Sequence, residues 1–217
     1  MSPTLTEGQR QWWPVGLRMA ALVALAAGMA ACGSSGTKTD AALPAGPDPV
    51  AIARYQEALV ALQAGDELQA ERQLQALVEA CPAYAGPMVN LAMIQARRQE
   101  LEPAAALLQR AVTVCEHCAV SWNQLGVVQR QQGQFDDAEQ SYLKAIAADA
   151  NYANARFNLA VLYELYLQRP ELALDQYARF RELTAADSAV AEVDKWIIDL
   201  QRRTTAVERS AQLEGSP

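Results

Sequence analysis

Three of the four cysteines and the single histidine are the residues of this chain whose types and spacing could do chemistry. Cys115, Glu116, His117 and Cys118 form a C-x-x-C motif, and Cys81 precedes it in the sequence. Thiols in such an arrangement can form a disulfide, exchange disulfides with another thiol or bind a metal ion. The single histidine excludes a His–His metal site or a multi-histidine catalytic centre within the chain.

The fourth cysteine, Cys32, follows a hydrophobic segment. Met19–Ala31 has thirteen residues without a charge, which is too short to span a membrane but fits the apolar region of a secretory signal. The segment ends in small residues before Cys32 and so resembles the bacterial lipoprotein signal, with Met29 where leucine is usual. The resemblance implies that residues 1–31 are removed, that Cys32 is lipidated and, because Gly33 follows, that the protein reaches the outer membrane. The alternative is an ordinary signal peptide cleaved near Ala31, which leaves Cys32 a plain thiol.

Composition narrows the class of protein. Hydrophobic residues (Ala, Val, Ile, Leu, Met, Phe, Trp, Tyr and Cys) make up 51% of the chain, which is too much for a disordered protein. Aromatic residues make up only 6%. The net charge is −7, and it becomes −8 without residues 1–31, with 16 basic and 24 acidic residues left (18 − 2 and 25 − 1), so a nucleic-acid partner is not expected. Residues 32–50, rich in Gly, Ser, Pro and Asp, are predicted to be a flexible tether.

Similar pentapeptides recur at a constant interval after the tether. Residues 122–126 (WNQLG) align with 156–160 (RFNLA), 88–92 (MVNLA) and 54–58 (RYQEA). Each block ends in a small residue, and a second small residue in each copy is followed four positions later by a large one. These small–large pairs are Ala70 with Leu74, Ala104 with Leu108, Ala138 with Tyr142 and Ala173 with Tyr177.

The pattern resembles the tetratricopeptide repeat, W-x2-L-G-x2-Y followed by A-x3-F and P. Copy 119–152 matches best, although Gln129 and Ala150 replace the usual tyrosine and proline. The resemblance implies an all-α, right-handed α-solenoid of about four helix pairs over residues 51–203. The predicted repeats are 51–84, 85–118, 119–152 and 153–187, the last with one extra residue near Leu167–Pro170. Residues 188–203, N-capped by Asp187 or Ser188, are predicted to be a capping helix, and 204–217 a disordered tail.

The register, in which Cys81 and Cys115 share one repeat position, leaves several interpretations of the C-x-x-C motif open. Haem attachment is excluded because Ala119, rather than histidine, follows Cys118. The motif ends a predicted helix, where the helix dipole disfavours a redox-active thiolate. Zinc binding by Cys81, Cys115, Cys118 and His117 is possible, but the spacing does not require it. A disulfide could join Cys115 to Cys118 if the helix end unwinds, or join either to Cys81, although equivalent repeat sites lie about 10 Å apart, beyond the ~4.4–6.8 Å of a disulfide. The remaining alternative is three partly buried thiols that act as small apolar residues.

The resemblance also implies a concave groove that holds an extended or helical peptide. Family positions 2, 5, 9, 12 and 13 place twelve residues there. They are Tyr55, Leu59, Val89, Met93, Arg97, Asn123, Val127, Arg130, Asn154, Phe157, Val161 and Glu164. Arg97 and Arg130 could bind a carboxylate or could simply be solvated.

Two classes of function remain. The first is a non-catalytic, lipid-anchored scaffold that binds a protein partner in the periplasm, with no cofactor, nucleic acid or small-molecule substrate. Such a scaffold would assist an envelope machine for energised transport, pilus secretin assembly or outer-membrane assembly. The second is a periplasmic redox or metal-binding factor that uses Cys115 and Cys118. The scaffold is favoured because the sequence contains no recognisable nucleophile–base pair, carboxylate dyad or phosphate-binding glycine loop.

Overall fold

The computed structural model describes residues 48–184 and 190–214 of the chain, with side chains for residues 48–184 and 193–206. The predicted signal peptide, Cys32 and nearly all of the predicted tether lie outside these residues, as do Asp187 and Ser188. In the described ranges, no helix is both long and apolar enough to cross a membrane.

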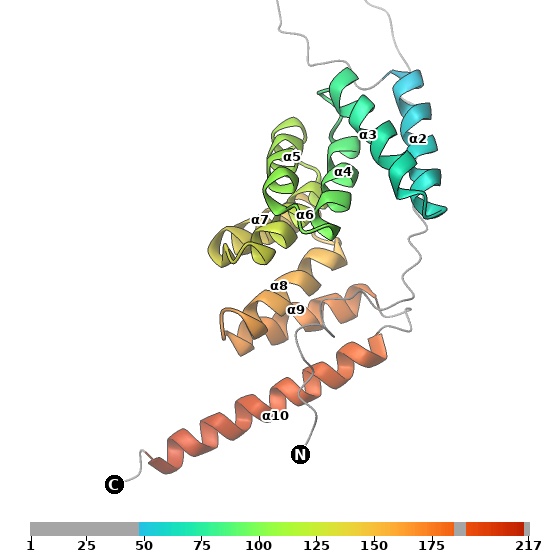
Figure 1. The fold of residues 1–217 in the computed structure, drawn as a ribbon. Coiled ribbons are helices and arrows are strands. Elements are labelled where there is room, and N and C mark those ends of the chain that lie inside the picture. The colour runs from blue at the N-terminus through green and yellow to red at the C-terminus, as the bar shows by residue number, and fades with distance from the viewer. Residues whose placement is uncertain (1–47, 185–189, 215–217) are drawn as a thin grey trace, which may run out of the picture. The chain divides into compact units, whose positions relative to one another are not determined.

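The described residues form nine α-helices and no strand, so the expected all-α helical repeat fold is confirmed (Figure 1). Each helix packs against the next one along the chain, and α4 and α8 also contact α6. The helices α2, α4, α6 and α8 are the first helices of four pairs, and α3, α5, α7 and α9 are the second helices. The bounds are α2 Pro49–Gln63, α3 Glu67–Ala80, α4 Ala85–Arg97, α5 Leu101–Val114, α6 Ala119–Gln131, α7 Phe135–Ala148, α8 Ala153–Leu165, α9 Pro170–Leu183 and α10 Val190–Glu214.

Small residues let the two helices of each pair approach closely. Ala58, Ala92, Gly126 and Ala160 have almost no exposed surface, and so have the large residues of the second helices, Leu74, Leu108, Tyr142 and Tyr177. In the third pair the small residue is Gly126, which faces the ring of Tyr142. A Cβ atom on Gly126 would lie 2.6 Å from Cε1 and 2.7 Å from Cδ1 of Tyr142. With its ring in this position, Tyr142 leaves no room for a Cβ atom at residue 126.

The turn inside each pair follows the repeat register. Gly65, Gln99 and Gly133 have positive φ angles of 80°, 64° and 77°, which fit the left-handed end of a first helix. In the fourth pair the positive φ, 53°, is at Gln168, one residue later than the register alone gives. The turn between α8 and α9 accordingly spans residues 166–169, whereas the turn between α6 and α7 spans residues 132–134.

The helical region is longer than the sequence indicates at both ends. The first helix begins at Pro49, two positions into the predicted tether, because the Asp48 carboxylate accepts a hydrogen bond from the amide of Ala51 and Pro49 suits the first turn. At the other end, α10 continues to Glu214, so a disordered tail from residue 204 is wrong. Composition suggested a frayed end, but Thr204 and Thr205 bond back to carbonyls one turn earlier inside the helix.

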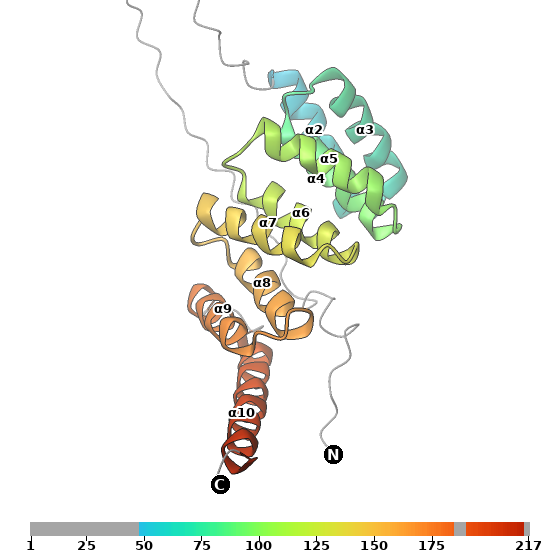
Figure 2. The same ribbon diagram turned by 90° about the vertical axis from the view of Figure 1, so that its left-hand side faces the viewer.

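Helix α10 takes the place that the first helix of a fifth pair would take, against α9 (Figures 1 and 2). Val193, Trp196, Ile197 and Leu200 form its buried side. Trp196 packs against Phe157 and Tyr177, with ring centroids 5.8 and 6.4 Å away. The apolar end of the fourth repeat is therefore covered.

Replacing Gly126 by alanine tests the close approach inside the third pair. We expect Gly126→Ala to lower the free energy of unfolding by about 2 kcal/mol, because the buried ring of Tyr142 has to move. Adding Tyr142→Leu creates the alanine–leucine pair that the first two repeats contain. The double variant should then be at least ~1 kcal/mol more stable than the sum of the single changes predicts, as measured by urea unfolding. Strict additivity would show that the ring does not impose the glycine.

Candidate partner-binding face and the cysteine turn

Apolar side chains at one repeat position are only half-buried on successive first helices. Leu59 on α2, Met93 on α4 and Val127 on α6 occupy the same position of their repeats, and each remains partly exposed. The fourth member of the series, Val161 on α8, is buried. The first three are therefore predicted groove residues whose apolar side chains remain partly accessible.

Two accessible residues of the same face were missing from the sequence-based set. Ile52 is 40% exposed and Val120 is 41% exposed. They precede Leu59 and Val127 by seven residues, or about two helical turns, so they lie on the same side of α2 and α6. Their repeat position is that of Asn154, which was predicted, so applying the register to every copy would have found them. We call Ile52, Leu59, Met93, Val120 and Val127 the apolar row.

Tyr55 and Asn123, predicted for the groove, instead join consecutive first helices. The hydroxyl of Tyr55 accepts a hydrogen bond from the side-chain amide of Asn90, and burial raises the pKa of Tyr55 to about 12. Asn123 is fully buried, and its side-chain carbonyl accepts a bond of 2.9 Å from the amide of Asn158. Both contacts link a residue to one 35 positions later, so these polar side chains set the alignment of neighbouring repeats.

Arg130 is a buried structural group rather than a groove cation. It is only 7% exposed, and its guanidinium donates to the hydroxyls of Tyr142 at 3.4 Å and Tyr166 at 3.3 Å. It also lies over the Tyr166 ring, 5.5 Å from the centroid. Desolvation acts to lower the pKa of Arg130, but the two tyrosines outweigh it and the pKa rises. Burial in turn raises the pKa of Tyr142 to about 12. A partner therefore does not find a free arginine here.

Phe157 and Glu164 face the capping helix. The Phe157 ring packs against Phe180 as well as Trp196, at a centroid distance of 5.2 Å from Phe180. The Glu164 side chain is 2% exposed, accepts a hydrogen bond from the Tyr177 hydroxyl and forms an ion pair with Arg203 of α10. Both residues thus belong to the contacts that hold α10 in place.

The last predicted groove residues divide between core and surface. Val89 is buried in the hydrophobic core, and the Asn154 amide lies 3.5 Å from the hydroxyl of Tyr152. Arg97, at the end of α4, keeps 52% of its side chain exposed while it pairs with Glu67 at 2.9 Å.

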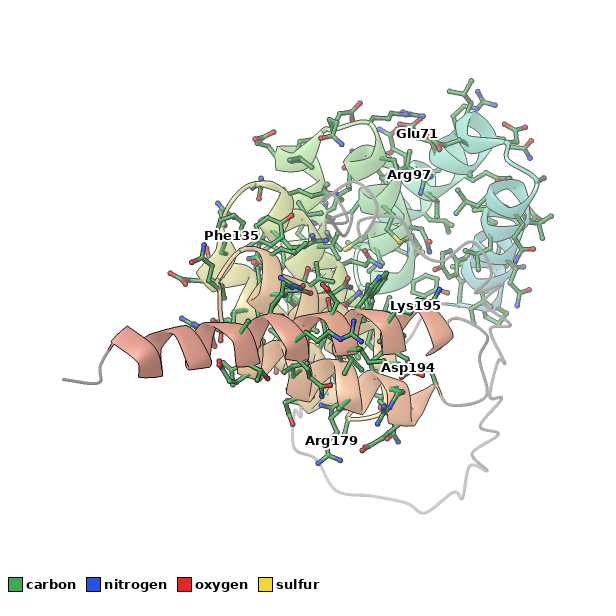
Figure 3. All side chains as sticks on the ribbon, turned by 90° about the horizontal axis from the view of Figure 1, so that it is seen from below. Glu71, Arg97, Phe135, Arg179, Asp194 and Lys195 are labelled. Carbon is green, nitrogen blue, oxygen red and sulfur yellow. A yellow bond between two sulfur atoms is a disulfide. The ribbon has the colours of Figure 1, made fainter. Side chains whose placement is uncertain are left out.

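Arg97 belongs to a charged cluster where the first turns of α3 lie beside the end of α4 (Figure 3). Arg98 pairs with Glu67 and Glu71, at 3.1 and 2.9 Å. The hydrogen bond from Arg97 is the main cause that lowers the pKa of Glu67. The cluster is solvated, so its ion pairs contribute little to stability.

A disulfide closes the turn between α5 and α6. It joins Cys115 to Cys118, whose Cα atoms are 5.4 Å apart, while Cys81 is free. Among the pairings that the sequence left open, the structure therefore has the one within the turn. Two of the four ligands of the zinc alternative are consumed by this bond. In the described part of the chain, no three Cys, His, Asp or Glu side chains are placed to hold a metal ion.

The disulfide does not require an unwound helix, because α5 already ends at Val114. Cys115 is the C-cap of α5, and Cys118 is the N-cap of α6. The expectation that the motif ends a helix is thus right for Cys115 and wrong for Cys118, which begins the next one. The indole N–H of Trp122 donates a hydrogen bond of 2.9 Å to the carbonyl of Glu116 and holds the turn against α6.

Comparisons with known proteins agree with the fold. The TPR repeat family matches residues 126–165. A TPR protein of Thermus thermophilus is 26% identical, with a TM-score of 0.59 over 70% of this chain and 81% of that one. PilF of Pseudomonas aeruginosa is 22% identical, with a TM-score of 0.63 over 77% of each chain. A chain of the APC/C hetero-tetramer Cut9–Hcn1 is 18% identical, with a TM-score of 0.60 over 68% of this chain and 29% of that one.

No protein among the curated sequences compared with this chain matches it significantly. Residues 126–165 therefore match the tetratricopeptide repeat, and the helix pairs have the fold of solved tetratricopeptide repeat proteins. Tetratricopeptide repeat domains bind protein partners, and one of these structural neighbours is itself part of a complex.

The two arginines predicted for the groove should differ sharply when their charge is reversed. Arg130→Glu places a carboxylate in a buried site and should cost about 3 kcal/mol or more of unfolding free energy. Arg97→Glu breaks one solvated ion pair and should cost at most ~1 kcal/mol. Urea denaturation of both variants gives the comparison. Equal, small losses would mean that Arg130 is a surface residue.

Proposed function

We propose that this protein is a scaffold that binds a protein or peptide partner through the apolar row on its first helices. The observation that carries the proposal is the recurrence of partly exposed apolar residues at the same positions of successive repeats. A fold that needed these side chains only for its core would bury them, as it buries Val161. Aligned apolar side chains with a regular spacing suit a helical or extended partner segment.

The same geometry limits the partner site to the first three pairs. At the fourth pair, Phe157 and Glu164 contact α10, and Arg130 is held by tyrosines. The partner therefore contacts α2, α4 and α6. None of the five side chains of the row titrates, so the surface is suited to binding rather than to catalysis, and we propose a non-catalytic role.

The proposed location rests on the N-terminal sequence. Residues 1–31 fit a lipoprotein signal, and Gly33 after Cys32 favours the outer membrane. A lipidated Cys32 would anchor the repeats to the periplasmic face of that membrane through the segment before Pro49. There the protein would serve as an accessory or assembly factor for an envelope machine, in energised transport, pilus secretin assembly or outer-membrane assembly.

Charges placed in the apolar row should abolish partner binding. The variant Ile52→Glu/Val120→Glu alters two exposed row residues, so the fold should be retained while capture of the partner falls at least tenfold, or about 1.4 kcal/mol. Crosslinking in intact cells, followed by purification and mass spectrometry, measures capture.

The matched control carries the same change on second helices. Leu143 and Leu172 are 40% and 45% exposed on α7 and α9, so Leu143→Glu/Leu172→Glu adds the same charge at similar exposure. We expect the control to capture the partner as the native protein does. Equal capture by both double variants would refute the assignment of the face, and capture of no partner by the native protein would argue against a scaffold.

The lipid anchor has its own test. Cys32→Ser removes the thiol to which the lipid would be attached in the proposed signal, so the protein should move from the membrane fraction to the soluble fraction of the periplasm. Cell fractionation and metabolic labelling with a palmitate analogue detect the change. Unlabelled native protein, or a variant that remains in the membrane, would make Cys32 an ordinary residue.

A further inference from the structure

The two sulfurs of the disulfide lie at opposite ends of two different helices. Cys115 ends α5, where the partial negative charge of the helix dipole disfavours a thiolate. Cys118 begins α6, a helix of 13 residues whose free amides and positive dipole end favour one. The dipoles of the two helices therefore act in opposite directions on the two sulfurs.

Among the residues that the structure describes, the same turn occurs three times, and one of these copies is crosslinked. In each copy, the backbone amide of the last turn residue donates a hydrogen bond to the carbonyl of the first. The donor and acceptor are Tyr84 and Cys81 at 2.9 Å, Cys118 and Cys115 at 3.2 Å, and Tyr152 and Asp149 at 3.1 Å. The backbone closes this turn without a disulfide at 81–84 and 149–152. A crosslink across so short a loop also removes little entropy from the unfolded chain. The turn itself therefore does not require the bond between Cys115 and Cys118.

We propose that the Cys115–Cys118 disulfide is a thiol–disulfide exchange site that oxidises a dithiol of another protein. A thiolate of that protein attacks the sulfur of Cys115, the bond between the two cysteines breaks, and Cys118 leaves as a thiolate at the N-terminus of α6. The positive end of the α6 dipole stabilises a thiolate at Cys118, which makes Cys118 the better leaving group.

The second thiol of the partner completes the exchange. It attacks the mixed disulfide, the partner acquires a disulfide, and Cys115 leaves with the electron pair and takes up a proton. One partner dithiol is oxidised and one disulfide of this chain is reduced, so the reaction is stoichiometric. Both cysteines are partly exposed, which gives the attacking thiolate access. The proposal does not use the apolar row.

Equilibration of the full chain with glutathione tests whether the bond exchanges. Free thiols are alkylated and quantified by peptide mass, so that Cys32 and Cys81 are read separately from the motif. We expect the pair to pass from disulfide to dithiol within mixtures of oxidised and reduced glutathione, with unchanged helical circular dichroism. A bond that persists in excess reduced glutathione, or helices that melt on reduction, would show a structural disulfide and overturn the proposal.

The single variants Cys115→Ser and Cys118→Ser are matched controls for the asymmetry. Each leaves one thiol in the same turn, and circular dichroism verifies its fold. At pH 7 we expect the thiol at position 118 to be alkylated about tenfold faster than the thiol at 115. Equal rates, or a faster thiol at 115, would contradict the assigned leaving group. Partner capture through the apolar row should survive Cys115→Ser, so failure of this proposal and failure of the scaffold are separable.

Discussion

The close approach of two helices at a small residue is the constraint on which the rest of the structure depends. Each first helix buries a small residue, each second helix buries a large one, and in the third pair Gly126 lies directly against the ring of Tyr142. This contact fixes the side of each helix that is inside the pair. Side chains on the opposite side of a first helix point away from its own pair. Val120 and Val127, seven residues apart on α6, can be exposed there only where the neighbouring repeat does not cover them. The apolar row is thus a consequence of helix packing.

The same constraint explains why charged residues at one repeat position are structural here. Arg130 and Glu164 occupy the same position of successive repeats, and each contacts the hydroxyl of the buried tyrosine of its own pair. The following element then supplies what each charge needs. For Arg130 it is the Tyr166 ring and hydroxyl at the end of α8, and for Glu164 it is Arg203 of α10. A charged side chain at this position finds its partners in the next repeat or helix. The sign of the charge that is tolerated therefore depends on the residues which that next element provides.

The sequence was sufficient for the fold because the repeat multiplies a weak pattern. One small residue before an apolar run indicates little, but four in register predict the helix pairs, and the shifted turn at Gln168 follows the extra residue. The site was harder to predict. Repeat position does not reveal whether a side chain such as Arg130 turns toward a tyrosine or toward solvent, because this depends on the residues opposite. The extent of α10 beyond residue 203 was also hidden, since its polar composition carries no strong apolar period.

The inter-repeat turn shows how a repeat fold can accept new chemistry at little structural cost. Its backbone hydrogen bond forms with cysteine, aspartate or tyrosine at the ends, so the residues there are free to vary. At Tyr84 the last residue packs edge-on against Tyr55, 5.1 Å between centroids. Cys118, at the same position of the next turn, has no aromatic ring and is bonded to Cys115 instead. There the indole of Trp122 contacts the turn through its hydrogen bond to the carbonyl of Glu116. Because every such turn ends one helix and begins another, a pair of cysteines across it is electrostatically unequal from the moment it is introduced.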